Sequence, residues 1–163
     1  PAVEVCLVTG RDCAARLSEL PANMRLKIRV PIEELQELIA GAKVVVLPVK
    51  ENTYSGATTT LLQCMAMGKA VAVSRVGAIR NGYDFVDGEH LRWMEPGSQK
   101  SLETVVDDLL ASGVRRKQLG RAARMHVESH LKWNQYVDQM RAAMQTVAGC
   151  KTFSFSGMYS QDV

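Results

Sequence analysis

Small and hydroxyl-bearing residues cluster between two apolar runs in the first half of the chain. Residues 54–60 read Tyr-Ser-Gly-Ala-Thr-Thr-Thr, and a helical pattern begins inside this run. The first N–H groups of a helix lack intrahelical partners and carry partial positive charge, so they bind anions, and nearby hydroxyls add donors. The chemistry that this spacing offers is recognition of a phosphate or diphosphate. The residues that would provide it are Ser55, Gly56, Ala57, Thr58 and Thr59.

The same run also has a structural interpretation that needs no ligand. Ser55 can cap the helix by accepting a hydrogen bond from a first-turn N–H group, while the threonines merely support the buried helix start. The local pattern alone does not separate a capped helix from an anion site. The elements on either side of the run therefore carry the argument.

Two buried strands flank the predicted helix. Residues 44–47 read Val-Val-Val-Leu, a continuous apolar run typical of a parallel strand that is covered on both faces. Leu61, Leu62 and Met65 then place apolar side chains on one face of the helix. Residues 70–74 predict a second buried strand, so the hydroxyl-bearing run lies at a strand-to-helix turn.

Strands and helices alternate from the start of the chain to its middle. Further strands are predicted at residues 3–8, 26–30 and 91–94, and a further helix at residues 31–41. This alternation predicts an α/β fold, a Rossmann-like doubly wound parallel sheet. Three C-terminal helices follow. Ser98 caps the first of them, and Trp133 heads the last and is expected to pack in the core.

The composition is that of a soluble globular protein. The 163 residues suit one domain, with 47% hydrophobic residues, 23% charged residues and a net charge of +3. No apolar stretch is long enough to span a membrane and no signal-peptide pattern opens the chain, so we expect a cytoplasmic protein. No zinc-finger or RNA-recognition pattern is present, so we expect no nucleic-acid partner.

The cysteines and histidines show no metal-ligand spacing, and we expect no metal site. The four cysteines form no CxxC pair; Cys6 and Cys64 lie in apolar segments and are expected to pack as small, reduced hydrophobic residues. His90, His126 and His130 are interpreted as surface or packing residues.

Several segments resemble one known family in their order and spacing. They read VPIEELQELIAGAKVVVLPV, LLQCMAMGKAVAVS, VDGEHLRWMEPGS and LGRAARMHVESHLKW. Together they resemble the C-terminal, nucleotide-sugar-binding half of the retaining, GT4-like glycosyltransferases of GT-B fold, over most of the chain. The resemblance implies one Rossmann-like half of a GT-B fold and a nucleotide diphosphate sugar, UDP- or GDP-linked, as the donor, with no other cofactor.

The family shares a motif of two Glu residues separated by seven others, and both carboxylates are absent here. Ser55 lies at the first position and Gln63 at the second, where the family's Glu binds the nucleotide ribose. Gln63 can still form hydrogen bonds with hydroxyls, but it carries no charge. Glu51 lies nearby but out of register, and it either replaces the lost carboxylate or is a solvated loop residue.

Three further residues follow the ends of other predicted strands. Arg29 and Val30 lie where the resemblance places edge contacts to the nucleotide base, although a solvated Arg29 is the alternative. Gly10, after the first strand, either lines the same crevice at the carboxyl ends of the sheet or simply terminates its strand.

The last residues break the helical trend. Phe153 and Phe155 alternate with serines, and Gly157 follows, which is a strand and turn pattern. The family's domain opens with a central strand, a Gly-containing loop and a helix, none of which precedes the first strand here. A sheet without its central strand would leave backbone groups unpaired, so a segment from elsewhere should fill the position.

The tail therefore has three interpretations. Residues 1–150 form the Rossmann-like donor-binding domain, and residues 151–163 are a permuted opening strand of its sheet, a plain tail, or a segment exchanged between chains. In the permuted arrangement, Gly157 and Met158 face the phosphates.

The resemblance implies a donor-binding domain of a hexosyl-type glycosyltransferase that moves a sugar from a nucleotide diphosphate sugar to an unknown acceptor. The acceptor site would belong to a missing N-terminal domain, so this chain alone is expected to be inactive, and any peripheral membrane contact is expected through that domain. No catalytic residue is assigned. The alternative is a non-catalytic nucleotide- or phosphate-binding regulatory module. A nucleotide-sugar epimerase would need acidic and His residues that the segment lacks.

Overall fold

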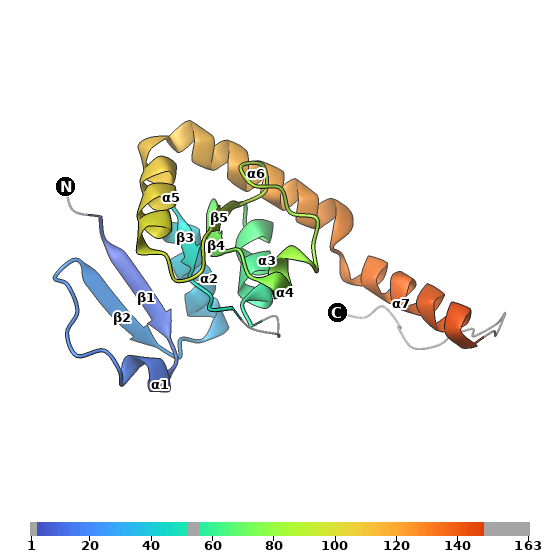
Figure 1. Cartoon of the computed structure of the whole chain (residues 1–163), viewed down its shortest axis with the longest axis horizontal. Coiled ribbons are helices and arrows are strands. Elements are labelled where there is room, and N and C mark those ends of the chain that lie inside the picture. The colour runs from blue at the N-terminus through green and yellow to red at the C-terminus, as the bar shows by residue number, and fades with distance from the viewer. Residues whose placement is uncertain (1–2, 52–55, 149–163) are drawn as a thin grey trace.

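The computed structural model describes residues 3–51 and 56–148 of the chain, and the predicted site residues Ser55, Gly157 and Met158 lie outside them. Helices and strands alternate through the first two-thirds of this part, and three helices follow (Figure 1). The elements are β1 (Val5–Thr9), α1 (Arg11–Ala14), β2 (Met24–Ile28), α2 (Ile32–Gly41), β3 (Val45–Leu47), α3 (Thr58–Ala66), β4 (Val71–Ser74), α4 (Gly77–Arg80), β5 (Arg92–Met94), α5 (Gln99–Ala111), α6 (Gly113–His130) and α7 (Trp133–Ala148).

All strand pairs in the described part of the chain are parallel, but they form two sheets. The first sheet pairs β1 with β2, from Val5 beside Met24 to Thr9 beside Ile28. The second has the order β3-β4-β5. The predicted α/β class with a parallel, Rossmann-like arrangement is confirmed. The break between the sheets lies between β1 and β3, where a central strand would be needed to join them.

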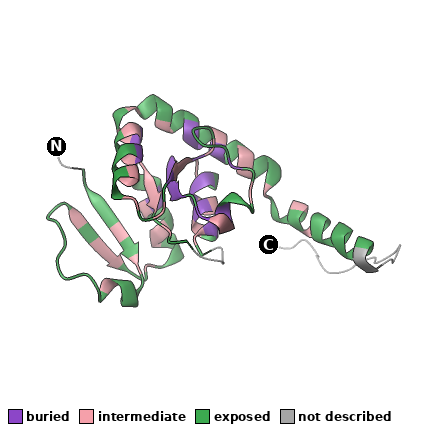
Figure 2. Ribbon diagram, viewed as in Figure 1, coloured by how far each residue is buried: buried purple, intermediate pink, exposed green. Residues whose placement is uncertain are grey.

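The core surrounds β4 and α3. Every residue of β4 is buried, as expected for a short apolar strand with a neighbour on each side. Leu61, Cys64 and Met65 of α3 are fully buried against one face of the three-stranded sheet, with Ile79 and Leu91. A second cluster, which includes Leu109 and Leu119 of α5 and α6, covers the other face. Figure 2 shows the buried residues gathered there, whereas β1 and α7 are mostly exposed and β2 is partly half-buried.

Helix α6 crosses close to the end of α3 at a glycine contact. A Cβ atom added at Gly120 would lie 2.0 Å from the carbonyl oxygen of Gly68, so only glycine permits this approach. Gly68 itself has a positive φ of 68° just beyond α3, which ends the helix. Gly68 and Gly120 thus set the distance between the end of α3 and helix α6.

Two predictions about packing are wrong. Trp133 is 70% exposed at the head of α7, and Cys6 is exposed in β1, because the neighbours that would cover them are absent from the described part of the chain. Cys64 is buried, as predicted. The four-residue helices α1 and α4 were not predicted. Among the described helices, none is both long and apolar enough to cross a membrane.

Candidate functional site

Three parallel strands end beside one another at the edge of the sheet where the candidate site lies. Pro48 follows β3, Ser74 ends β4 and Met94 ends β5. The hydroxyl of Ser74 is buried and accepts a hydrogen bond from the Val49 N–H at 2.9 Å, which ties the chain beyond β3 to the end of β4. In parallel sheets, ligands bind at this carboxyl edge.

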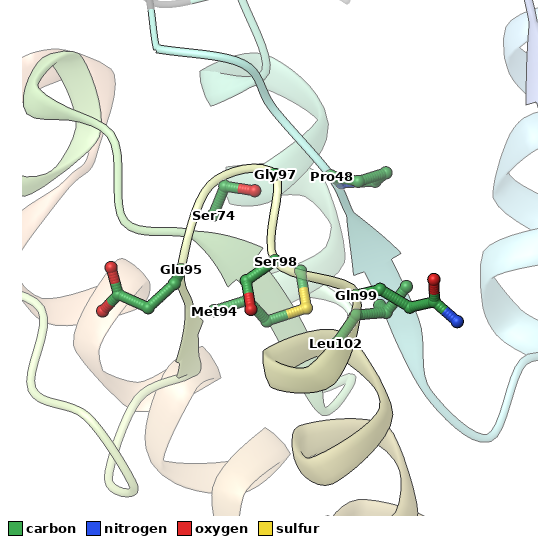
Figure 3. A pocket seen from close by; sticks show the side chains of 8 residues that line it. All are labelled: Pro48, Ser74, Met94, Glu95, Gly97, Ser98, Gln99 and Leu102. Atoms are coloured by element: carbon green, nitrogen blue, oxygen red, sulfur yellow. The ribbon is translucent and has the colours of Figure 1, made fainter.

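A small cavity opens at this edge. Its volume is about 240 Å³, and its lining runs from Pro48, Ser74 and Met94 to Gly97 and Ser98 before α5 (Figure 3). Pockets for whole drug-sized ligands have volumes of roughly 300–1,000 Å³. This cavity therefore fits one group of a larger ligand rather than the whole of it.

Helix α3 begins at the same edge without a side-chain cap. Its N-cap residue is Ala57, and no side chain of the described residues accepts a hydrogen bond from its first turn. Ser55 lies outside the described residues, so the Ser-capped interpretation of this helix stays a prediction beside the anion site. Helices α5 and α6, in contrast, are capped by Ser98 and Ser112, whose hydroxyls each accept a first-turn N–H at 3.2 Å. At the start of α3, no side chain in the described ranges occupies the first-turn N–H groups, which is the arrangement that an anion site needs.

Thr58 adds an unused polar atom to the start of α3. Its side chain is 8% exposed, and its Oγ1 has no hydrogen-bond partner among the described residues. A buried hydroxyl without a partner costs free energy, roughly 1–3 kcal/mol, so this Oγ1 would gain from an added hydrogen-bond partner. Thr58, one of the predicted site residues, thus lies at the start of α3 with a hydroxyl that no described residue uses.

Thr59 and Gln63 lie on the outward face of α3. They are four positions apart in the helix, so their Cβ atoms lie roughly 5–6 Å apart along one face. Thr59 is exposed and Gln63 is half-buried, while Thr58 and Leu61 belong to the buried face. Gly56 is exposed and directly precedes Ala57, the N-cap residue of the helix. The structure therefore brings together Gly56, Ala57, Thr58 and Thr59, with Gln63 one turn further on.

Glu51 lies beside this site and has a defined backbone partner. Its Oε1 accepts a hydrogen bond from the N–H of Gly77, the first residue of α4, at 2.9 Å. The carboxylate thus holds the segment after β3 against the segment after β4. Glu51 is also exposed, as expected of a solvated loop residue, and one of its carboxylate oxygens is occupied by the backbone.

Gly10 and Arg29 form a second group at the carboxyl end of the β1–β2 pair. The Arg29 N–H donates to the Thr9 carbonyl at 3.0 Å, so the two strand ends lie next to each other. Arg29 has a φ of 53°, an unusual conformation for a residue with a side chain, and its side chain is exposed. Val30 is half-buried beside it. No strand pairing in the described part of the chain joins this group to the start of α3.

Two arginines that the motif search did not select lie near the site. Arg75 directly follows β4, its N–H donates to the Met94 carbonyl at 2.8 Å, and its side chain is exposed. Arg80 closes α4 and is also exposed. The position of Arg75 directly after a buried strand was the available signal, because such residues lie at the carboxyl edge. In the described residues, no cluster of three His, Cys, Asp or Glu has the arrangement of a metal site.

The parallel α/β fold with its carboxyl-edge site is the Rossmann-like fold of the GT-B glycosyltransferases. Residues 2–112, more than half of the chain, match the protein family described as Glycosyl transferases group 1. The chain belongs to this family. A search of the curated proteins found no match.

Solved structures show the same fold. HepE of Anabaena, determined in complex with UDP, has a TM-score of 0.69 at 14% identity, over 88% of this chain and 41% of that protein. Sucrose-phosphate synthase of Thermosynechococcus elongatus has a TM-score of 0.66 at 20% identity, over 78% of this chain and 31% of that protein. The C-terminal domain of a group 1 glycosyl transferase, LpcC of Francisella tularensis, has a TM-score of 0.58 at 19% identity, over 68% of this chain and 55% of that one. The chain spans about a third to a half of these structures.

Proposed function

We propose that this chain is the donor-binding domain of a glycosyltransferase, which binds a nucleotide diphosphate sugar and transfers its sugar to an acceptor. The observation that carries the proposal is the start of α3. Among the described residues, the N-terminus of α3 has no side-chain cap and the buried Oγ1 of Thr58 has no partner, and both lie at the carboxyl edge of a parallel sheet. Membership of the glycosyl transferases group 1 family supports the reaction class.

The residues at the start of α3 bind the diphosphate. Backbone N–H groups after Gly56 and the hydroxyls of Thr58 and Thr59 donate to the phosphate oxygens. When the bond from the sugar to the diphosphate breaks, negative charge grows on the leaving phosphate, and donors fixed beforehand stabilise that charge most. The exposed guanidinium of Arg75 adds positive charge at the same edge.

The rest of the nucleotide lies along α3 and toward the β1–β2 pair. Gln63, one turn beyond Thr59, forms hydrogen bonds with the ribose hydroxyls through its amide. Arg29 and Val30, with Gly10 beside them, contact the edge of the base. The UDP complex of HepE makes uridine the first nucleotide to test, with GDP as the second.

The remaining parts of the reaction lie outside this chain. In the proposed arrangement, this is the C-terminal domain of a GT-B enzyme, and an N-terminal domain supplies the acceptor site. Peripheral membrane contact, where it occurs, is made through that domain. The isolated chain binds the donor in the cytoplasm without transferring its sugar.

Calorimetric titration of the chain with UDP, GDP and their sugar conjugates tests the proposal. We expect saturable binding that Thr58→Val weakens, because valine keeps the volume of threonine and removes the hydroxyl. Gln63→Ala should weaken binding further. Matched controls are Thr104→Val in α5, whose hydroxyl already bonds the Lys100 carbonyl, and Gln139→Ala in α7. Equal loss in the control variants would contradict the proposed site.

A non-catalytic binding module is the second candidate function, and one observation favours it. Ser55 and Gln63 replace both carboxylates of the family motif, so charge-assisted contacts to the donor are lost. Such a module would bind free phosphate or nucleotide at α3 but would not distinguish a sugar nucleotide from the nucleotide alone. Absence of saturable binding to any nucleotide would reject the donor-site proposal outright.

A further inference from the structure

The cavity beside α5 lies apart from the start of α3. Its lining includes Met94 and Leu102, which belong to the core cluster on the α5 side of the three-stranded sheet. The buried residues of α3, such as Leu61, belong to the cluster on the other face. The diphosphate proposed at α3 therefore does not account for this cavity, which has a volume of about 240 Å³.

Hydrogen bonds fix both walls of the cavity. On the β3 side, the Ser74 hydroxyl accepts from the Val49 N–H at 2.9 Å. On the α5 side, the Glu95 N–H donates to the Ser101 hydroxyl at 3.0 Å, and the Ser98 hydroxyl accepts from the Ser101 N–H at 3.2 Å. The Ser98 N–H in turn donates to the Glu95 carbonyl at 3.1 Å. Walls that are held in place beforehand lower the entropy cost of binding.

Two hydroxyl groups at the cavity have protons to donate. Ser74 is 3% exposed and Ser98 is half-buried, and the oxygen of each already accepts one backbone N–H. Neither hydroxyl donates a hydrogen bond within the part of the chain that the structure describes. A hydroxyl can donate one hydrogen bond in addition to those it accepts, and a buried donor gains from a partner. The cavity therefore favours a ligand with oxygen atoms that accept hydrogen bonds.

Much of the remaining lining is apolar. Met94 is 2% exposed, and Leu102 of α5 is half-buried. Gln99 adds no free amide donor here, because its Nε2 donates to the Glu103 carboxylate at 2.8 Å, and its side chain extends away from Met94 in Figure 3. Apolar walls with a few fixed polar groups are typical of small-molecule sites.

The charge at the mouth of the cavity disfavours an anion. Of the 8 lining residues, all of them described, only Glu95 is charged. It is exposed, and its carboxylate has no partner among the residues that the structure describes. The Ser98 hydroxyl also occupies a first-turn N–H of α5, in contrast to the start of α3. A carboxylate only accepts hydrogen bonds, so a ligand at this mouth should be neutral and should carry hydroxyl groups.

We propose that this cavity binds a neutral sugar ring. The hydroxyls of Ser74 and Ser98 donate to oxygen atoms of the ring, and the C–H face of the ring packs on Met94 and Leu102. A ring hydroxyl at the mouth donates to Glu95. The ring is either the sugar of the nucleotide donor or one unit of a free saccharide, which share this chemistry. The proposal does not depend on nucleotide binding at α3.

Amide NMR of the isotopically labelled chain, titrated with the methyl glycosides of glucose, galactose and mannose, tests the site. We expect saturable shifts at Gly97 and Ser98 with at least one glycoside, and none at Ala57 beside α3. Glu95→Gln keeps the size of the side chain and removes its charge, so it should weaken binding roughly three- to tenfold. The matched control Glu37→Gln changes an exposed residue of α2 and should bind like the original chain.

A second variant removes the buried donor. Ser74→Ala should abolish the shifts at Gly97 and Ser98. Because the Val49 N–H then loses its acceptor, thermal unfolding should accompany this variant to show that it is folded. Glu95→Gln lies at an exposed position and keeps the test decisive where Ser74→Ala does not fold.

Nucleotide sugars distinguish the two sources of the ring. Shifts at Gly97 and Ser98 with UDP-glucose or GDP-mannose, but not with UDP or GDP, would assign the ring to the donor. Equal shifts with a methyl glycoside in the presence and absence of UDP would assign it to a separate saccharide. Both results support the proposal. Shifts at Ala57 with UDP test the donor site of α3 separately.

Three results would overturn the proposal. The first is the absence of shifts at Gly97 and Ser98 with every glycoside and nucleotide sugar. The second is tighter binding of glucose 6-phosphate than of methyl glucoside at these amides, which would make the cavity an anion site. The third is glycoside binding that Glu95→Gln and a folded Ser74→Ala leave unchanged, which would place the sugar elsewhere.

Discussion

Thr58 is the side chain on which the proposed site depends most. Its neighbour Ala57 cannot cap α3, and its own hydroxyl is buried without a partner in the described part of the chain. A protein that only needed a stable helix would place Ser or Asp at the N-cap, as this chain does for α5 and α6. The start of α3 therefore differs from those of α5 and α6 in having no side-chain cap among the described residues.

Cys64 provides a prediction about reactivity. Burial raises the pKa of its thiol to about 11, so the thiol is protonated and shielded at neutral pH. We expect iodoacetamide to modify Cys6 and Cys13, which are exposed, and to modify Cys64 only after unfolding. Peptide mapping by mass spectrometry measures each site. Rapid labelling of Cys64 in the native protein would show that the α3 core opens readily.

Three histidine rings stack between α6 and the loop before β5. The ring centroid of His126 lies 4.1 Å from that of His90 and 4.8 Å from that of His130, and Phe85 meets it edge-on at 5.5 Å. The predicted packing role of these residues is thereby confirmed. Because neutral rings stack and charged rings repel, this contact should depend on pH.

Acidification should destabilise the fold through His126. Burial lowers the pKa of His126, His90 and His130 lower it further, and Asp84 and Glu89 oppose them. The unfolded chain then binds more protons below pH 6.5, so stability is full above that value and falls as pH drops through the folded-state pKa. Thermal unfolding at a series of pH values should show a smaller loss below pH 6.5 for His126→Gln. An unchanged pH profile in this variant would assign the loss to other groups.

The close contact between α3 and α6 leads to a prediction about two glycines of α6, Gly120 and Gly113. A Cβ at Gly120 would overlap the backbone of Gly68, whereas a Cβ at Gly113 meets only the Arg116 guanidinium at 3.5 Å. We expect Gly120→Ala to lower the free energy of unfolding by about 1–3 kcal/mol or more, because backbone must move. Gly113→Ala should change it by less than about 0.5 kcal/mol. Urea unfolding compares them, and equal effects would disprove the close approach.

Elements with a strong repeat were predictable, and short ones were not. The helices that include Leu61 and Leu109 have apolar residues at helical spacing over several turns, and the strands have short continuous apolar runs. Helices α1 and α4 have four residues each, too few for any period to show. Trp133 and Cys6 were placed in the core because an apolar face indicates that burial is favourable, not that a covering element is present.

The candidate site was predictable only where it is local in sequence. The run from Gly56 to Thr59 was found because a helix start is recognisable from neighbouring residues. The bonds from Gly77 to Glu51 and from Val49 to Ser74 join residues 26 and 25 positions apart, which only the folded sheet brings together. The role of Glu51 therefore had to come from the structure.

At the scale of the whole molecule, the two sheets divide the proposed nucleotide site. The residues proposed to bind the diphosphate lie at the start of α3, which packs on the three-stranded sheet, whereas Gly10 and Arg29 follow the ends of β1 and β2. Contact of one nucleotide with both groups is therefore a separate prediction. We expect Arg29→Ala to weaken nucleotide binding and the control Arg25→Ala, near the opposite end of β2, to leave it unchanged, as measured by calorimetry. Equal affinity in both variants would show that α3 binds the nucleotide without the β1–β2 pair.

The most direct test of the central claim is a titration of the isotopically labelled chain with UDP, followed by amide NMR. The account predicts saturable shifts at the amides of Ala57, Thr58 and Thr59 and at Gln63, with the capped start of α5 unchanged. The result that would contradict it is a set of shifts confined to the basic residues of α6, or no shift at α3 at any nucleotide concentration.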